Sequence, residues 1–550
     1  MNRQLKTLPQ ITVEINGAAL ELSERASLAE VRVQQRLSLP ALCELTFFDA
    51  TGFLAGDLLS PGADLRVSVA GADTPLFTGQ ITAVEHVYEP SNLRKIRLRA
   101  YDRLHLLRKR QQVRAFVQMT LSDLIGELVR DFSLFVEAAE NSALRERIIQ
   151  FEQTDFDLMA QLAERNGLYF ALREDTLHVF TLEGIASDDS IPLRLGENLL
   201  EARVEINADK ICRAVSTTGW NALRVENFSG SAESFRNGRS IGAGIDDASF
   251  GDEFRRVITD ENITDEAEAA AISQAELDWR AAQEVTFWGA AEGNPKLQPG
   301  TPVEVEGMAQ NLNGSYVPAA VNHTIDTIKG FVSEISTALP KPALRQKQSL
   351  ATFGIVTGLD DPENFGRVRV KLPNYNDVET DWMQVVGMGA GIGKGLVALP
   401  DIDDTVLVFF PRGELTQGII LGGLYGTIQR EDWDWGVEES KVKRFRLQTA
   451  GNQKISFDDV RQILRMENSD GSFIEMSPEK VSLHAQRDLE ITAPGRGILI
   501  KAKTIDFERA EDVEEPPKSR QQTPAAGEIQ EIRDARQRAE ERHEEDADSE

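Results

Sequence analysis

The sequence contains little cysteine, with only Cys43 and Cys212 in 550 residues. Both lie in apolar segments, and two cysteines give no disulfide framework, so we expect buried free thiols. The six histidines are scattered, and they form neither an H-E-x-x-H motif nor a pair with cysteine at the spacing of metal ligands. The sequence therefore predicts no cofactor and no metal site made by neighbouring residues.

Long apolar runs and an excess of positive charge are also missing. The sequence has no run of eighteen apolar residues, and its first ten residues, MNRQLKTLPQ, lack the apolar core of a signal peptide. We therefore expect synthesis and assembly in the cytoplasm without a signal peptide. Acidic residues outnumber Lys and Arg by 89 to 60, which gives a formal charge of −29. Because nucleic-acid binding requires a basic surface, this charge argues against nucleic acid as a partner.

One segment satisfies the G-x-S-x-G pattern of serine hydrolases, with Gly238, Ser240 and Gly242 at its fixed positions. That motif requires a buried strand before the serine and a helix after it. Here Ser229–Phe235 is polar, and the residues after Gly242 are rich in glycine and aspartate, which break a helix. We interpret Ser240 as part of a loop. A tail-associated hydrolase that uses Ser240 is the enzymatic alternative.

A glycine-rich segment, Gly387–Gly395, looks like a phosphate-binding loop but lacks its essential residues. Met388 stands where the first glycine is needed, and Gly395 stands where a serine or threonine would bind Mg²⁺. We interpret the segment as a connection between strands of a small barrel, leading into a strand at Gly395–Ala398. The sequence predicts no catalytic residue and a protein that is not an enzyme.

The chain is too long for one core and divides by composition. Its first part reads as strands with a few helices: Asn16-Gly17 predicts a hairpin turn, Thr154 caps a helix, and an alanine-rich stretch predicts a helix over 265–283. A compact unit of strands, Ala351–Gly426, follows a linker-like segment. We expect a mainly β fold with some α.

Pairs of apolar residues two positions apart recur eight times between Phe445 and Phe507, and all but the seventh pair flank a polar residue. The pairs start seven to ten residues apart, and turn-forming residues lie between them. This pattern predicts narrow strands with one apolar face. No helix follows to cover that face, so we expect several copies of the chain to bury it around one axis as a rigid β-prism. The predicted needle core is Leu464, Met466, Ile474, Met476, Val481, Leu483, Leu489, Ile491, Ile498, Ile500, Ile505 and Phe507. Whether His484 faces the axis and binds a metal there is left open.

Several segments carry a resemblance to a known family. Residues 351–426 resemble the OB-fold module of contractile injection systems. The segments that carry this resemblance are FGIVT (353–357), DP (361–362), FGRVRV (365–370), DW (381–382), LP (399–400), DTVLV (404–408) and LGGLY (421–425). The preceding part of the chain resembles phage baseplate-hub and late-control proteins. The residues that carry this resemblance are TDFD (154–157), LAERNGLY (162–169), LQPG (297–300), GSY (314–316) and His323. In this order the segments span roughly residues 10–510, and the whole is similar to VgrG-type spike proteins.

The resemblance implies four regions: a phage hub or late-control-like domain over 1–345, an OB-fold domain over 350–430, a trimeric β-prism needle over 440–510, and an acidic tail over 511–550. The implied fold has β-barrel-like hub domains, an OB-fold and an intertwined trimeric β-prism or β-helix needle. Such a homotrimer caps the inner tube, contacts tube and baseplate proteins, carries a PAAR-like tip protein and pierces the target membrane mechanically. About fifteen residues join the OB unit to the needle, so the lysozyme domain of a phage relative is absent there.

Two features bear on the kind of particle. The array of apolar pairs between Phe445 and Phe507 is short, which favours an extracellular phage-tail-like particle. The segment GELTQ (413–417) favours the same class, because type VI proteins usually carry a proline-containing stretch there. A type VI secretion spike, associated with the cell envelope, and a phage tail hub protein are the alternatives. Residues 511–550 hold fourteen acidic and six basic residues and few large aliphatics, so we expect a disordered or solvated helical tail. The tail either docks cargo or a tip protein or only keeps the protein soluble.

Overall fold

The computed structural model describes residues 9–48, 59–90, 94–140, 142–221, 226–245, 254–259, 263, 265–340, 349–426 and 435–508. The predicted acidic tail therefore lies outside the described residues. The chain forms two compact units, Met1–Gln429 and Arg430–Glu550.

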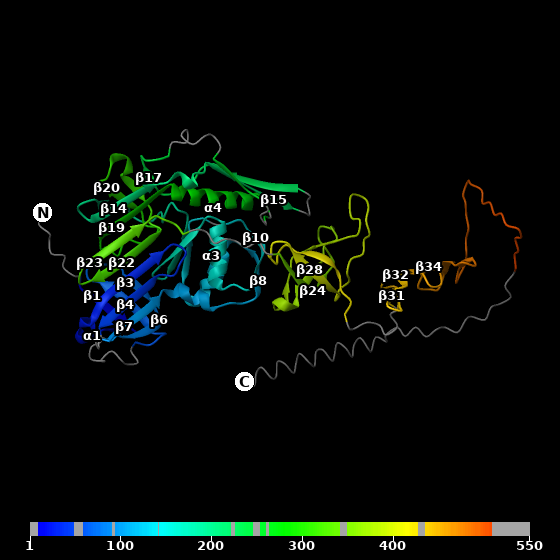
Figure 1. The fold of residues 1–550 in the computed structure, drawn as a ribbon, viewed down its shortest axis with the longest axis horizontal. Coiled ribbons are helices and arrows are strands. Elements are labelled where there is room, and N and C mark those ends of the chain that lie inside the picture. The colour runs from blue at the N-terminus through cyan, green and yellow to red at the C-terminus, as the bar shows by residue number, and fades with distance from the viewer. Residues whose placement is uncertain are drawn as a thin grey trace. The chain divides into compact units, whose positions relative to one another are not determined.

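An eleven-stranded sheet is the largest element of the first unit (Figure 1). Its order is β14-β19-β23-β22-β3-β4-β7-β6-β5-β1-β2. Strands from the two ends of the described residues 9–340, which we call the hub region, therefore lie side by side. The strands are β1 (Ile11–Ile15), β2 (Ala18–Ala19), β3 (Leu28–Arg36), β4 (Leu42–Phe48), β5 (Asp64–Val69), β6 (Phe77–Tyr88), β7 (Arg94–Tyr101), β14 (Leu199–Ile206), β19 (Val285–Glu292), β22 (Ala320–Asp326) and β23 (Gly330–Ser336); the short helix α1 (Leu22–Ala26) precedes β3.

Two separate cores lie along this sheet. One is built from β1 and β3–β7, and the other from β14, β19, β22 and β23 with the smaller sheet β13 (Ile191–Arg194), β20 (Val303–Glu306), β21 (Gly314–Tyr316) and β17 (Ser240–Ile241). Antiparallel pairing of β3 with β22 joins them, with Val33 opposite His323. The predicted hairpin turn is confirmed: Asn16 and Gly17 both have positive φ and connect β1 to β2.

A segment of mixed helices and strands follows β7. It contains the 3₁₀ helices Arg103–Lys109 and Arg130–Phe132, β8 (Arg114–Met119), α2 (Leu121–Val129), β9 (Phe135–Ala138), β10 (Arg145–Gln150), α3 (Asp155–Arg165), β11 (Tyr169–Arg173) and β12 (Thr176–Phe180). The predicted cap of α3 is confirmed, because the Thr154 hydroxyl accepts from the Asp157 backbone N–H and the Asp157 carboxylate accepts from the Thr154 N–H. The apolar faces of α2 and α3 share one core with β11 and β12.

The predicted long helix is also confirmed, as α4 (Glu266–Glu284). It packs against the three-stranded sheet β16 (Glu226–Ala232), β15 (Ala214–Asn221) and β18 (Arg255–Ile258). The Ser273 hydroxyl, buried on α4, donates to the Gly230 carbonyl at 2.9 Å and also contacts the Thr217 hydroxyl. Cys43 and Cys212 are buried and free, as predicted.

The OB unit is a six-stranded sheet, β26-β25-β24-β28-β29-β27. A single acid–base pair shapes one of its turns: Asp361 accepts from the backbone N–H groups of Glu363, Phe365 and Arg367, and its carboxylate also accepts from the Arg367 guanidinium at 2.6 Å. These donors hold the pKa of Asp361 well below its usual range, and the Arg367 side chain has the largest effect. Gly395–Ala398 is not a strand, contrary to expectation, and belongs to a long loop. The strands are β24 (Leu350–Gly358), β25 (Arg369–Leu372), β26 (Val378–Glu379), β27 (Gln384–Val385), β28 (Thr405–Phe410) and β29 (Ile419–Gly423), and the 3₁₀ helix Pro373–Tyr375 follows β25.

Residues of the hub region complete the core of the OB unit. Ile149 on β10 is buried in the same cluster as Val356, Val370 and Val408, and half-buried residues around β8 pack against it. The Phe151 and Tyr375 rings meet edge to face with centroids 5.6 Å apart. The Arg147 guanidinium donates to the Glu379 carbonyl at 2.6 Å. Hub and OB unit are thus joined by a shared apolar core as well as by the chain.

The second unit is a meander of short antiparallel strands. The described strands are β30 (Val437–Glu438), β31 (Lys441–Val442), β32 (Arg444–Gln448), β33 (Lys454–Asp458), β34 (Ile463–Glu467), β35 (Phe473–Met476) and β36 (Val481–His484). The expected mainly β fold with some α is confirmed.

A buried histidine gives the hub a pH-dependent stability. The His323 ring lies between the Ser333 hydroxyl at 2.8 Å and the Leu297 carbonyl at 3.1 Å, and burial lowers the pKa of His323 to about 4. The unfolded chain takes up a proton near pH 6.5 while the folded chain stays neutral, so stability is lost as pH falls from 6.5 to 4. We expect a loss of about 3 kcal/mol from this residue.

We therefore expect the stability difference between wild type and His323→Gln to shrink as pH falls through this window, because glutamine does not titrate. Groups that titrate in both proteins cancel in the difference. Denaturant unfolding at pH 7.5, 6, 5 and 4 measures it, and a difference that is constant with pH would contradict the buried neutral histidine.

Candidate functional site

The apolar residues of the C-terminal strands line up across the meander in two continuous rows. Neighbouring strands place Leu447 opposite Ile455, Phe445 opposite Phe457, and so on through β36. One row is Leu447, Ile455, Met466, Ile474 and Leu483, and the other is Phe445, Phe457, Leu464, Met476 and Val481. The first five predicted pairs thus share one face, which we call the apolar face. Directly opposed side chains lie about 4.5–5.5 Å apart at Cβ, so each row is a contiguous apolar strip.

This apolar face is open to solvent in a single chain. Eight of its ten residues are exposed, from 41% for Ile474 to 71% for Val481, while Ile455 and Leu464 are partly buried. Scattered exposed apolar residues are ordinary, but contiguous apolar surface of this kind marks an interaction site.

Polar turn residues fix the register that builds the two rows. Asn452 and Gln462 adopt positive φ in successive turns, and the Asp458 carboxylate accepts from the backbone N–H groups of Val460 and Arg461. These hydrogen bonds hold the pKa of Asp458 below its usual range, and the bond from the Arg461 N–H has the largest effect. Gly471 supplies the next left-handed position. A shift of one residue would move every apolar side chain to the other face, so the turns determine which surface is apolar.

The opposite face of the meander carries its own polar and aromatic cluster. The Arg465 guanidinium pairs with Glu475 at 2.9 Å and Glu467 at 3.1 Å, and it lies 3.8 Å from the centre of the Phe473 ring. The Phe473 ring in turn stacks on His484, with centroids 5.0 Å apart. His484 therefore lies on the face opposite the two rows, which argues against an axial metal ligand at this position. Among the described residues, no group of three or more His, Cys, Asp and Glu side chains is placed to hold a metal ion.

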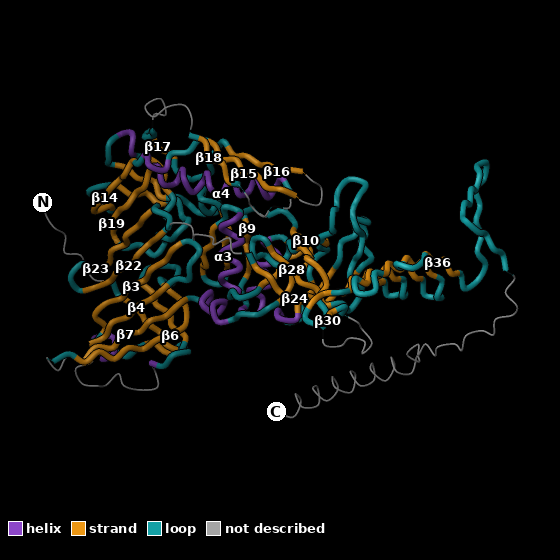
Figure 2. Tube along the Cα trace, turned by 45° about the vertical axis from the view of Figure 1, so that its right-hand side comes forward, coloured by secondary structure: helices purple, strands orange, loops and turns teal. Residues whose placement is uncertain are grey.

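The last three predicted pairs are placed differently. Leu489, Ile491, Ile498, Ile500, Ile505 and Phe507 are all exposed but lie in turns and loops, and Figure 2 shows loop beyond β36. A strand exists only through ladder hydrogen bonds to a neighbour, and within the described chain residues 485–508 form no such ladder. The sequence pattern recognised their alternation but could not show whether the partner strand belongs to the same chain.

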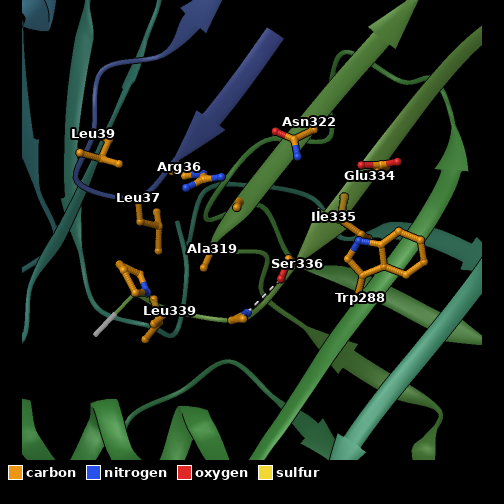
Figure 3. Close-up of a pocket in the computed structure, with 13 residues that line it drawn as sticks. Arg36, Leu37, Leu39, Trp288, Ala319, Asn322, Glu334, Ile335, Ser336 and Leu339 are labelled. Carbon is orange, nitrogen blue, oxygen red and sulfur yellow. Dashed lines mark hydrogen bonds between the residues drawn. The ribbon is translucent and has the colours of Figure 1, made fainter. Parts of the chain in front are cut away.

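Two cavities lined by described residues of the first unit have structural rather than catalytic surroundings. One of about 330 Å³ lies on the sheet at β3, β22, β23 and β19 (Figure 3). Of the residues that line it, only Arg36 and Glu334 are charged, and the walls are largely apolar, with Leu37, Ala319 and Trp288 among them.

A larger cleft of about 910 Å³ includes Asp102, Arg173 and Asp188, and these two carboxylates make hydrogen bonds that hold the fold. The Asp188 carboxylate pairs with the Arg173 guanidinium and accepts from the Thr301 hydroxyl at 2.8 Å. Asp102 accepts from the backbone N–H groups of Ala41 and Leu104, and burial raises its pKa to about 7.

The two sequence motifs considered as catalytic have structural settings. Ser240 lies in the two-residue strand β17, where it pairs with Ser315 of β21, rather than in a sharp strand-to-helix turn. Residues 387–395 lie in the loop between β27 and β28, and a strand follows this loop where a phosphate-binding loop would lead into a helix. In the described part of the chain, no helix has both the length and the apolar character needed to cross a membrane.

Comparison with known families assigns both parts of the first unit. Residues 6–327 match the family described as Alg8 N-terminal domain. The chain belongs to the Alg8 N-terminal domain family. Residues 352–425 match the family described as type VI secretion system/phage-baseplate injector OB domain, as the OB-fold resemblance predicts. This pairing of domains, with the relatives below, confirms the predicted resemblance of this Alg8-family chain to VgrG-type spike proteins.

The curated relatives of the Alg8-family chain include the type VI secretion system spike protein VgrG3 of Vibrio cholerae serotype O1. The two are 24% identical over 428 residues, which cover 71% of this chain and 40% of the relative. The Alg8-family chain thus spans well under half the length of that relative.

Solved structures support the same fold for this Alg8-family chain. An E. coli type VI component, described as structurally similar to the T4 bacteriophage tail proteins gp27 and gp5, aligns over 75% of this chain and 99% of its own with 13% identity and a TM-score of 0.51. A chain of the Francisella PdpA–VgrG complex aligns over 88% of this chain and 81% of its own with 12% identity and a TM-score of 0.52. At these identities the likeness supports the fold alone.

Proposed function

We propose that the chain is the structural spike of a contractile injection system, a homotrimer that caps the inner tube and pierces the target membrane. The observation that carries this proposal is the apolar face, with its two aligned rows and no cover within the described part of the second unit. Three copies around one axis would turn the three apolar faces inward and bury both rows in a shared core. Burying one side chain of this size contributes about 1.5–3 kcal/mol, so ten of them strongly favour association.

Residues 485–508 would complete the needle in that assembly. The pairs from Leu489/Ile491 to Ile505/Phe507 continue the alternation of β32–β36 and are exposed in the single chain. Strands from the neighbouring copies would supply the ladders that these residues do not form within their own chain. We therefore keep all twelve predicted core residues, from Leu464 to Phe507, as residues of the trimer interface.

The other regions would have mechanical tasks. The hub, residues 1–345, would dock on the inner tube and baseplate proteins, and the OB domain, 350–430, would form a collar above the needle, 440–510. A PAAR-like tip protein would sit on the needle. The shared hub–OB core around Ile149 supports mechanical coupling of these two regions, because a load applied to the hub reaches the OB unit through packed side chains. In this proposal the protein is not an enzyme, and its action on the target membrane is mechanical.

Mass measurement in solution tests the proposal directly. Light scattering of the purified protein should give about three times the chain mass of 61.0 kDa. The mass should hold on dilution to nanomolar concentration, as expected for an obligate interface. A 61.0 kDa particle at micromolar concentration would overturn the homotrimer.

We further propose that this spike belongs to an extracellular phage-tail-like particle. The short array and Gly413–Gln417 support this class, whereas the name of the V. cholerae relative supports a type VI spike; a phage tail hub protein is the remaining alternative. Particles collected from cell-free medium of the source cells separate these cases. Sheathed particles without DNA that contain the chain support the proposal, and its retention in the cell envelope supports the type VI alternative.

Removal of residues 511–550 is expected to leave the trimer mass and melting temperature unchanged, because the segment has few residues suited to burial. The segment carries fourteen acidic and six basic residues, a net charge of −8 per chain and −24 per trimer. Such a charge attracts basic partners and weakens with salt over a Debye length of about 8 Å. We propose that it docks cargo or a tip protein. Mass spectrometry of particles assembled with full-length and truncated protein checks this, and identical contents would leave only a solubilising role.

A further inference from the structure

The OB unit carries a second exposed apolar surface, the loop of residues 386–402 between β27 and β28, which we call the OB loop. Five of its seventeen residues are glycine, and Lys394 and Asp401 are its only charged residues. Ile392 at its tip is fully exposed, and the other exposed large apolar residues of the loop are Val386, Met388, Leu396, Val397, Leu399 and Ile402. Loops of this length without regular structure are uncommon in compact domains and are usually functional.

The OB loop has a defined conformation despite its exposure. The Leu396 N–H donates to the Met388 carbonyl at 3.0 Å, and the Gly391 and Lys394 backbones exchange hydrogen bonds at 3.0 and 3.2 Å. These bonds fold the loop into a hairpin-like arm with Ile392 at the turn. At Gly395, with φ of +134°, an added Cβ would approach the Ala390 Cα to 2.9 Å, so the two sides of the arm are closely packed. A preformed apolar arm loses little conformational entropy when it docks.

We propose that the OB loop docks on the OB domain of a neighbouring copy of this chain. The inference rests on the proposed homotrimer. Residues 427–434 connect the OB unit to the C-terminal strands, and eight residues span at most about 30 Å. Needles joined in a trimer therefore hold three OB domains close together around the axis.

The symmetry and chemistry of the OB unit fit this occupant. A threefold contact is heterologous, so it needs two different surfaces on each copy. Outside the OB loop, the same domain also exposes the apolar side chains of Phe365, Leu421 and Leu424. With one positive and one negative residue in the arm, neither nucleic acid nor a strongly charged protein surface is favoured as its occupant.

Thiol labelling of full-length Ile392→Cys tests the inference. The two native cysteines are buried, so they give little background. In a sample with trimer mass, we expect the introduced thiol to react with maleimide at least tenfold more slowly than a thiol at Asp73→Cys, an exposed position in the hub. After dissociation in denaturant the two rates should become equal.

Two results would overturn the OB-loop inference while leaving the trimer standing: equal labelling rates in a particle of trimer mass, or protection of Ile392→Cys that arises only when inner tube protein is added. A monomer mass would instead overturn the proposed function and this inference with it. As a second readout, Val397→Asp should lower the melting temperature of the trimer, whereas Lys394→Gln on the same arm should not. An unchanged melting temperature for Val397→Asp would count against the docked arm.

Discussion

Leu483→Arg is expected to prevent the protein from forming a stable trimer. Leu483 ends one of the two apolar rows, directly opposite Ile474, and it is exposed in the single chain. In the proposed assembly the substitution places an unpaired charge in a shared apolar core. An unpaired buried charge costs several kcal/mol, and threefold symmetry repeats it three times. Light scattering should therefore show monomers or aggregates where the wild type shows trimers.

Ser482→Arg is the matched control, one residue away on the opposite face. Ser482 lies across from Glu475, next to the Arg465 ion pairs, so an arginine there can reach a carboxylate. It should be tolerated. Ile491→Arg extends the test to residues 485–508 and should also impair association if that segment joins the interface. Unchanged trimer mass and melting temperature in Leu483→Arg would show that the apolar face is exposed to solvent in the functional protein.

Local sequence signals predicted much of the candidate site. The period-two alternation identified which residues share a face, and the turn residues between the pairs identified where each strand ends. The alternation could not predict the register in which neighbouring strands pair. The alignment of Leu447, Ile455, Met466, Ile474 and Leu483 in one row depends on hydrogen bonds between strands, which the structure shows.

Contacts between distant segments of the chain could not be predicted from the sequence. Pairing of β3 with β22 joins residues nearly 300 positions apart, and no local pattern announces it. The role of Ile149 was missed for the same reason, because its strand reads as part of the hub while its side chain lies in the OB core. A boundary placed by composition in the linker divides a core that the two regions share.

The ribbon that carries Ile149 is held by a buried carboxylate. Asp155, the first residue of α3, is fully buried and accepts from the guanidinium groups of Arg110 and Arg114 and from the Gln150 amide at 2.8 Å. Gln150 also pairs with Arg114 across β10 and β8 and accepts from its guanidinium at 2.9 Å. Asp155 thereby ties the start of α3 to both strands of the ribbon that enters the OB core.

Asp155→Ala is therefore expected to destabilise the hub and to loosen its joint with the OB unit. Removing the carboxylate leaves two guanidinium groups without their shared partner. Loss of one member of a buried ionic network costs about 3–5 kcal/mol, and we expect the lower end because Arg110 and Arg114 remain partly exposed and Arg110 keeps Asp131. Denaturant unfolding at fixed protein concentration measures the loss.

Asp157→Ala on the same helix is the control. Asp157 is exposed and contributes only to the cap with Thr154, so the expected cost is about 1 kcal/mol. Hydrogen–deuterium exchange separates the two effects: in Asp155→Ala, amides of β25 and β26 in the OB unit should exchange faster, because the ribbon that packs on them is released. In Asp157→Ala these amides should be unaffected. Equal exchange in the two variants would mean that the OB unit keeps its structure without the ribbon, and that a load on the hub is passed through the linker alone.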